Sequence, residues 1–316
     1  MNCKIKWNDL SLNEWEKRFS VIARSNLLQS YVYARAVCKT KYKKARWGLI
    51  LIDGHEAGLV QILETGILKN LFHTVELDRG PLWFDGYGGA VHIKSFFKEF
   101  NRQFPDRFGR RRRFIPEIDS GPSAEKILGQ TGLKSSSSVS AYQTLWWDLT
   151  LDEETARKNL KSNWRGSLNK AERSELVTEW DDQGRLYRWI RGIYALDKEI
   201  RGFGGVSPKL LDNLAAFSAQ GHSMIIGKVS KDGRDIAGTL FFVHGQSATY
   251  QLGWSSDEGR QYCAHHLLLW QARDILKKHG ITYLDLGGVN DESAAGVKKF
   301  KEGTNAESIK LVGHYT

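Results

Sequence analysis

The stretch that decides the fold is MIIGKVSKDGRDIAGTLFFVHGQSATYQLGWS, residues 224–255. It contains three runs rich in β-branched and aromatic residues, separated by Lys231-Asp232-Gly233 and by Gly245-Gln246. Turn residues between such runs are typical of β-hairpins. The stretch therefore predicts a meander of three antiparallel strands.

The segments around the meander predict alternating helices and strands. After it, residues 261–280 have the pattern of a helix that ends at Gly280, and residues 281–288 that of a strand. Before it, residues 152–175 predict a long charged helix, 176–180 a strand, and 183–200 and 209–221 two helices. This order, a meander followed by helix, strand and helix, resembles that of an acyltransferase domain of the GNAT type.

The first half of the chain repeats this pattern loosely. Residues 46–66 predict a hairpin around Asp53-Gly54, 73–84 and 141–150 predict strands, and 10–23, 25–40 and 90–104 predict helices. We therefore expect an α/β (α+β) fold with two GNAT-like domains, each a mixed, mostly antiparallel sheet flanked by helices. The expected domains are 1–147 and 148–305, and the closing strand 306–316 is a candidate to return to the first.

Composition and charge limit the classes of partner. The 316 residues are 41% hydrophobic and 11% aromatic, which excludes a disordered chain, and they carry a net charge of +10. A basic surplus favours nucleic acid, phosphorylated carriers or an anionic membrane face. An ordinary soluble protein that happens to be basic is an equally good explanation.

The cysteines and the apolar runs point to a reduced compartment. Cys3, Cys38 and Cys263 are too far apart for a disulfide framework or a zinc site. The adjacent His265 and His266 point to different helix faces, so no metal site is expected. No window reaches 18 uncharged apolar residues. We expect a cytoplasmic protein. Peripheral association with the inner membrane surface, where it would act on a lipid-linked substrate, is an open alternative.

Several segments, in order, resemble the FemABX family of non-ribosomal peptidyltransferases. They are LLQSYVYARAV (27–37), ELDRGPLWFD (76–85), YQTLWWDLT (142–150), NWRGSLNKAERSEL (163–176), the long stretch 248–288 and GVKKFKEG (296–303). The sequence departs from the family pattern at Tyr33, where tryptophan is usual, and at Leu168, where isoleucine is usual. It also lacks the long helical arm that some members insert.

The resemblance implies an enzyme that moves an amino acid from aminoacyl-tRNA to an amine, with a peptidoglycan precursor peptide as acceptor. It implies no cofactor, a tRNA partner, a phosphorylated or lipid-linked acceptor, and a monomer. One alternative is an acyl-CoA-dependent N-acyltransferase on a small amine or sugar. RQYCAHH (260–266) lacks the glycine-rich pyrophosphate loop which that alternative requires. A non-catalytic basic RNA-binding protein is the other alternative.

Lys301 is the first candidate catalytic residue, because an acyl transfer needs a donor for the oxyanion. A solvated lysine on a basic helix is the competing explanation. Asp85 is the second candidate, as the group that orients or deprotonates the amine, although an Asx turn would also explain it.

The candidate binding residues fall into two sets. Arg165 and Lys161, spaced i, i+4, would hold acceptor phosphates, or would be ordinary surface cations. Substrate contacts are also expected from Tyr250, Trp254, Gly287, Gly288 and Phe300. The tRNA-binding candidates are Arg110, Arg111, Arg112, Arg113, Lys298 and Lys299; the arginine run is otherwise a solvated loop.

Overall fold

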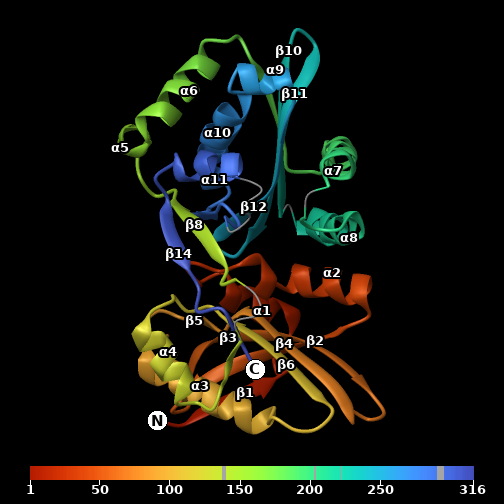
Figure 1. Cartoon of the computed structure of the whole chain (residues 1–316), viewed down its shortest axis with the longest axis vertical. Helices are drawn as coiled ribbons and strands as arrows, with labels where there is room; N and C mark the ends of the chain where they lie inside the picture. Colours follow the sequence, from red (N-terminus) through yellow and green to blue (C-terminus); the bar gives the residue numbers. More distant parts are fainter. Residues whose placement is uncertain (137–139, 203, 222, 290–294) are drawn as a thin grey trace. The chain divides into compact units, whose positions relative to one another are not determined.

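The computed structural model describes residues 1–136, 140–202, 204–221, 223–289 and 295–316. By its internal contacts the chain divides into two compact units. The first comprises Met1–Gln143 with Ile309–Thr316, and the second comprises Thr144–Ser308 (Figure 1). In the described residues, no helix is both long and apolar enough to cross a membrane.

The first unit is built on an eight-stranded mixed sheet. Its strands run in the order β1-β2-β3-β4-β6-β15-β7, and β5 pairs with β3. The strands are β1 (Cys3–Trp7), β2 (Lys44–Ile52), β3 (His55–Ile67), β4 (Phe72–Gly80), β5 (Leu82–Trp83), β6 (Arg110–Pro116), β7 (Ser135–Ser136) and β15 (His314–Tyr315). The helices are α1 (Leu12–Phe19), η1 (Leu27–Gln29), α2 (Tyr31–Lys41), α3 (Ala90–Gln103) and α4 (Pro122–Gly129).

The second unit is built on a seven-stranded sheet. The strand order is β14-β8-β13-β12-β11-β10-β9. The strands are β8 (Gln143–Asp148), β9 (Val177–Asp181), β10 (Met224–Lys231), β11 (Arg234–His244), β12 (Ser247–Ser255), β13 (Tyr283–Asp285) and β14 (Glu307–Lys310). The helices are α5 (Glu153–Asn159), α6 (Ser162–Glu172), α7 (Tyr187–Arg201), α8 (Pro208–Ser218), η2 (Ala219–Gly221), α9 (Asp257–Gln261), α10 (Ala264–Lys278) and α11 (Ala295–Glu302).

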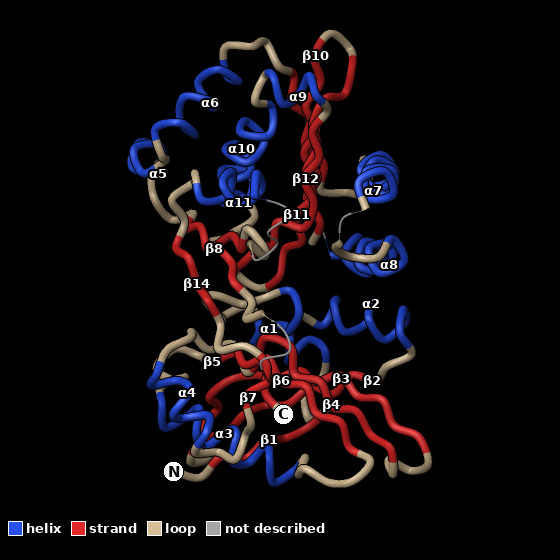
Figure 2. Tube along the Cα trace, in the orientation of Figure 1, coloured by secondary structure: helices blue, strands red, loops and turns tan. Residues whose placement is uncertain are grey.

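Each sheet contains four consecutive antiparallel strands followed by a parallel one. In the first unit, β1 to β4 pair antiparallel and β6 then pairs parallel to β4. In the second, β9 to β12 pair antiparallel and β13 then pairs parallel to β12. Helices precede each parallel strand, because a parallel neighbour requires a crossover (Figure 2). The predicted fold class is confirmed by this arrangement.

The lengths of the two parallel pairs differ. β4 and β6 pair at seven positions, from His73↔Arg110 to Gly80↔Pro116, with a register shift between Asp78 and Gly80. β12 and β13 pair at only three positions, which end at Thr249↔Asp285. Beyond that point, β12 continues to Ser255 while the other chain leaves the sheet.

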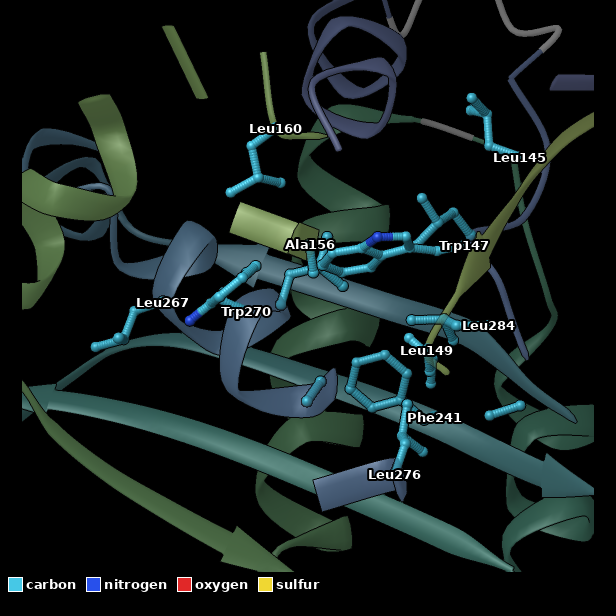
Figure 3. Packing of buried hydrophobic residues seen from close by; sticks show 14 of the residues in the cluster. Leu145, Trp147, Leu149, Ala156, Leu160, Phe241, Leu267, Trp270, Leu276 and Leu284 are labelled. Atoms are coloured by element: carbon cyan, nitrogen blue, oxygen red, sulfur yellow. The ribbon is translucent and has the colours of Figure 1, made fainter. Parts of the chain in front are cut away.

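Apolar side chains fill a core on each unit. In the second unit, Trp147, Trp270 and Phe241 pack with leucines from β8, α10 and β13 (Figure 3). In the first, four phenylalanines at helical spacing or on β6 form the centre: Phe96, Phe97, Phe100 and Phe114. Burial of this apolar area is the main stabilising contribution to each unit.

Two local predictions were wrong. The helix expected over 152–175 is interrupted, because Leu160 and Lys161 take extended backbone angles and separate α5 from α6. Leu160 is buried in the core, so the break is stabilised by packing. The arginine run is not a solvated loop, since Arg110–Arg113 form the start of β6.

Candidate functional site

The candidate site lies in the second unit, where β12 and β13 separate. Lys301, near the end of α11, is only 6% exposed, and its ammonium donates a hydrogen bond of 3.0 Å to the carbonyl of Gly288. Nζ also lies 5.6 Å from the centre of the Tyr250 ring, a cation–π distance. These contacts hold one lysine of a basic helix against the diverging strands.

Gly287 provides the turn that brings this backbone to Lys301. Its φ is +75°, and a Cβ there would lie 3.3 Å from the Tyr250 carbonyl oxygen and 3.6 Å from Lys301 Nζ. A side chain would be strained and would crowd the ammonium, so glycine is required here. The segment 290–294, between this turn and α11, lies outside the described residues.

A buried carboxylate supports the turn. Asp285 ends β13 with no exposed surface, accepts a hydrogen bond of 2.8 Å from the Gly287 amide and one from the Thr144 hydroxyl. Its negative charge also raises the pKa of Lys301. Asp285 therefore both orients the turn and favours the charged form of the lysine.

A β-bulge aims Tyr250 at this site. Along β12 the register with β11 shifts, so that Leu240 pairs with Leu252 but Phe241 pairs with Tyr250. The extra residue, Gln251, reverses which face the following side chains use. The Tyr250 hydroxyl consequently lies 2.7 Å from His265 Nε2 on α10.

Aromatic rings form one side of the site. Phe300, the neighbour of Lys301, lies 5.4 Å from His265, 4.9 Å from His266 and 5.9 Å from Trp164 on α6. Trp164 packs tightly on Gly303, where a Cβ would lie 2.2 Å from the indole. The close approach fixes α6 against the end of α11.

Burial shifts the titration of these groups. It lowers the pKa of Lys301 from 10.5 to about 8, although the Asp285 charge opposes the shift. Burial, with the neighbouring His266, lowers the pKa of His265 to about 4, and burial raises that of Tyr250. At neutral pH the lysine is charged and the imidazole neutral, and the tautomer of His265 sets the direction of its hydrogen bond with the Tyr250 hydroxyl.

Trp254 does not join the site. The bulge at Gln251 puts it on the opposite face of β12 from Tyr250, and its ring stands edge-on to Trp189 of α7 at 6.4 Å. The expectation that both aromatic residues line one groove is wrong, because their even spacing is offset by one inserted residue.

The other predicted residues of the second unit lie nearby on α6 and α11. Lys161 is the exposed N-cap residue of α6, and its amide bonds to the Gly303 carbonyl at 3.0 Å. Arg165 is half-buried and donates to the Lys158 carbonyl at 3.2 Å. Lys299 is exposed, and Lys298 lies 4.0 Å from Glu302. Their roles stay predictions.

The first unit holds the remaining candidates. Asp85 is exposed and accepts a hydrogen bond of 3.0 Å from the Gly86 amide, as an Asx turn would. In the arginine run, Arg112 is buried against Asn101 and the Phe104 carbonyl. Arg113 binds Asp78, with bonds of 2.7 and 2.6 Å.

These bonds correct the picture of four equivalent cations. Arg110 donates to the Pro105 carbonyl at 3.0 Å, and Arg111 is the exposed member of the run. Arg112 and Arg113 are committed to acceptors inside the unit, so the run does not present a continuous row of cations. The alternating pattern of a strand is the physical reason.

Sequence reasoning missed five members of the site: Trp164, His265, His266, Asp285 and Thr144. No sequence signal distinguishes Trp164 and Thr144 from ordinary core residues, and the adjacent histidines were considered only as metal ligands. Asp285 carries a usable signal, since an acidic residue in the apolar run LDLGG must be buried and paired. The described residues contain no group of three His, Cys, Asp or Glu side chains that could hold a metal ion.

Known proteins are similar to this chain in sequence or in fold. The sequence model of the FemAB family matches residues 218–316, which carry the meander, α10 and Lys301. Aminoacyltransferase FemA of Staphylococcus aureus is 32% identical over 85 residues. The crystal structure of FemX superposes with a TM-score of 0.79, at 14% identity over 98% of this chain and 96% of that one. The likeness to the FemAB family is therefore carried by the C-terminal third of the chain.

The fold of this chain is shared more widely. A tandem GNAT protein from the clavulanic acid biosynthesis pathway has a TM-score of 0.52, at 11% identity over 99% of this chain and 98% of that one. These likenesses confirm two GNAT-like domains. The match to FemA covers 25% of this chain and 20% of FemA. Arg165 and Lys161 lie outside the segment that the FemAB family matches.

Proposed function

We propose that the protein is an aminoacyltransferase that moves an amino acid from aminoacyl-tRNA to an amine of a peptidoglycan precursor peptide. The observation that carries the proposal is the buried Lys301 ammonium at the point where β12 and β13 separate. A buried charge is costly, so a lysine kept there in preference to an apolar residue suggests a chemical role. The match of residues 218–316 to the FemAB family supports the same reaction.

In the proposed reaction the acceptor amine attacks the ester carbonyl carbon of the charged tRNA. A carbon–nitrogen bond forms, the ester bond to the tRNA ribose breaks, and the amine loses a proton. The carbonyl oxygen carries negative charge in between, and the Lys301 ammonium stabilises it. One of its three N–H groups binds the Gly288 carbonyl, which fixes its direction.

The surrounding residues suit an aminoacyl group. Tyr250 and Phe300 supply apolar surface, while Gly287 and Gly288 let backbone approach the ligand closely. Binding of acceptor phosphates by Arg165 and Lys161, orientation of the amine by Asp85, and tRNA contacts by Arg111, Lys298 and Lys299 are further parts of the proposal.

The acyl-CoA alternative is less well supported by the backbone before α10. A pyrophosphate cradle needs amides that point at the ligand. Here five amides of the region donate to acceptors within the chain at 2.9–3.1 Å; they belong to Gly259, Arg260, Tyr262, Cys263 and His266. Helix α9 thus takes the place of a phosphate loop.

Substitution of Lys301 tests the proposal. With charged tRNA and a UDP-linked muropeptide, product is measured by mass spectrometry. Lys301→Met should lower kcat by about 10²–10³-fold, as expected when one oxyanion donor is lost. Lys278→Met, which removes an exposed charge at the end of α10 in the same unit, is the matched control and should stay within about twofold.

Two treatments separate the alternatives. Ribonuclease should abolish the transfer if tRNA is the donor, whereas activity with acetyl-CoA alone would establish the other acyltransferase. Undiminished turnover of Lys301→Met would refute the role of this lysine. A protein that binds RNA but forms no product with either donor would be the non-catalytic alternative.

A further inference from the structure

Exposed apolar side chains gather at one end of the first unit's sheet. Of the fourteen exposed large hydrophobic residues in the described part of the chain, five lie at the β3–β4 turn, with the strand ends beside it, or in the loop before β6. We define them as the apolar tip: Ile67, Leu68, Leu71, Phe72 and Phe108. The Phe72 and Phe108 rings lie 6.5 Å apart, so the two segments form one surface. Such a concentration marks an interaction site.

The tip projects beyond the neighbouring strand. Pairing between β2 and β3 ends at Lys44↔Glu64, whereas pairing between β3 and β4 continues to Ile67↔Phe72. Three further residues of each strand extend roughly 10 Å past that neighbour. The hairpin turn therefore stands at the far end of the strands (Figure 1).

The backbone of the tip is satisfied from within. The Arg107 guanidinium donates to the Leu71 carbonyl at 3.1 Å, to the Phe108 carbonyl at 2.9 Å and to the Asn70 carbonyl. The Leu71 amide donates to the Leu68 carbonyl at 3.1 Å. A loop that enters an apolar phase must bind its own polar backbone groups, and these bonds satisfy four carbonyls and one amide of the tip.

Cations surround the apolar residues. Residues 67–73 and 105–111 contain Lys69, Arg107, Arg110 and Arg111 against the single carboxylate of Asp106. Lys69 and Arg111 are exposed. Apolar side chains with basic residues beside them match an anionic membrane surface, where the cations bind headgroups and the apolar groups enter the interface.

The backbone of the turn also has positive φ values at non-glycine residues, which do not favour the stability of the folded chain. Leu68, Lys69 and Asn70 have φ values of +51°, +54° and +67°. Leucine in the left-handed region is disfavoured, and Leu68 is also 69% exposed. The strained backbone and the exposed apolar side chain are both unfavourable, and both belong to Leu68, which does not pack in a core. This combination indicates selection for a contact outside the chain.

We propose that the apolar tip inserts into the interface of an anionic lipid bilayer and docks the protein at a membrane surface. The proposal goes beyond the transfer reaction, which a freely diffusing enzyme could also perform. A protein partner fits less well, because a stable interface needs roughly 800 Å² on each side and the tip is a narrow turn. RNA fits less well because three of the five side chains, those of Ile67, Leu68 and Leu71, are aliphatic and neither bind phosphates nor stack on bases.

Vesicle flotation of the full chain tests the proposal. The vesicles contain equal parts phosphatidylglycerol and phosphatidylcholine, or phosphatidylcholine alone, in low and high salt. The tip variant is Leu68→Asn with Phe108→Ser; asparagine tolerates the left-handed backbone, so folding should be preserved. The control variant, Val177→Ser with Ile200→Ser, removes side chains that are 68% and 73% exposed in the other unit.

The wild type should float with the anionic vesicles and lose binding in high salt. The tip variant should partition about tenfold more weakly, and the control within about twofold of the wild type. Lys69→Gln with Arg111→Gln should remove the preference for anionic lipid.

Four results would overturn the proposal. The first is that the wild type floats with neither vesicle. The second is equal flotation of the wild type and the tip variant. The third is a wild-type dimer, seen by light scattering without lipid, that the tip variant abolishes, since the tip would then bind a second copy. Tip substitutions that weaken tRNA binding but not flotation would likewise assign the surface to RNA.

Discussion

Replacing Lys301 by methionine should stabilise the protein at neutral pH, and the gain should shrink in alkali. In the folded chain, burial lowers the pKa of this lysine from 10.5 to about 8. In the unfolded chain the ammonium is hydrated and has its ordinary pKa. Below about pH 8 both states are protonated, so folding bears the whole cost of burying the charge.

The size of the effect follows from the two pKa values. The difference between 10.5 and about 8 corresponds to roughly 3 kcal/mol of lost stability at pH 7. The cost falls as pH rises through the folded pKa, and at pH 9.5 it is smaller by about 2 kcal/mol. Methionine loses the hydrogen bond to Gly288, which offsets about 1 kcal/mol of the gain at both pH values.

Urea unfolding of the wild type and of Lys301→Met, at pH 7 and pH 9.5, measures this. The variant should be more stable at pH 7 by about 2 kcal/mol, and its advantage should nearly vanish at pH 9.5. Other titrating groups affect both proteins alike and cancel in the comparison. A difference that does not change with pH, or a less stable variant at pH 7, would show that Lys301 is not buried as a cation.

Two further substitutions test the surroundings of Lys301. Gly303→Ala should destabilise the protein by about 1–3 kcal/mol, because the new Cβ would lie 2.2 Å from Trp164. Gly296→Ala, where the new Cβ meets open space, should be neutral or slightly stabilising. Thermal unfolding of both variants measures the contrast, and equal effects would contradict the packing of Trp164 on Gly303. Asp285→Asn removes the charge that raises the pKa of Lys301, so the rate of transfer should fall about tenfold at pH 8 but persist at pH 6. A variant whose transfer rate declines at the same alkaline pH as that of the wild type would exclude this coupling.

The regular parts of the fold could be predicted because local signals and packing agree. Asp53 and Gly54 have φ values of +49° and +89°, which the Asp-Gly dipeptide adopts easily, and the predicted hairpin forms there. The Ser11 side chain caps α1 in a capping box with Glu14, as its position before the apolar spacing suggested. At such places no distant residue is needed to determine the structure.

The misplaced residues depend on tertiary packing that periodicity cannot reveal. Nothing local distinguishes Gln251 as a bulge, yet this residue decides that Tyr250 faces His265 while Trp254 faces Trp189. Likewise, Lys298, Lys299 and Lys301 look alike in sequence. The helical spacing, together with the turn at Gly288, determines which of them is buried.

The two sheets explain why the candidate chemistry lies in the second unit. Both follow the same order of strands, but in the first the parallel pair is closed over seven positions and Arg113 bridges it to Asp78. In the second the pair parts after three positions, and the turn at Gly287 enters the space with Lys301 beside it. Parting strands expose backbone and end-of-strand side chains to a ligand, whereas a closed pair buries them. The same topology therefore gives a first unit whose parallel strands stay hydrogen-bonded to each other, and a second unit with a charged lysine at the point where the parallel strands separate.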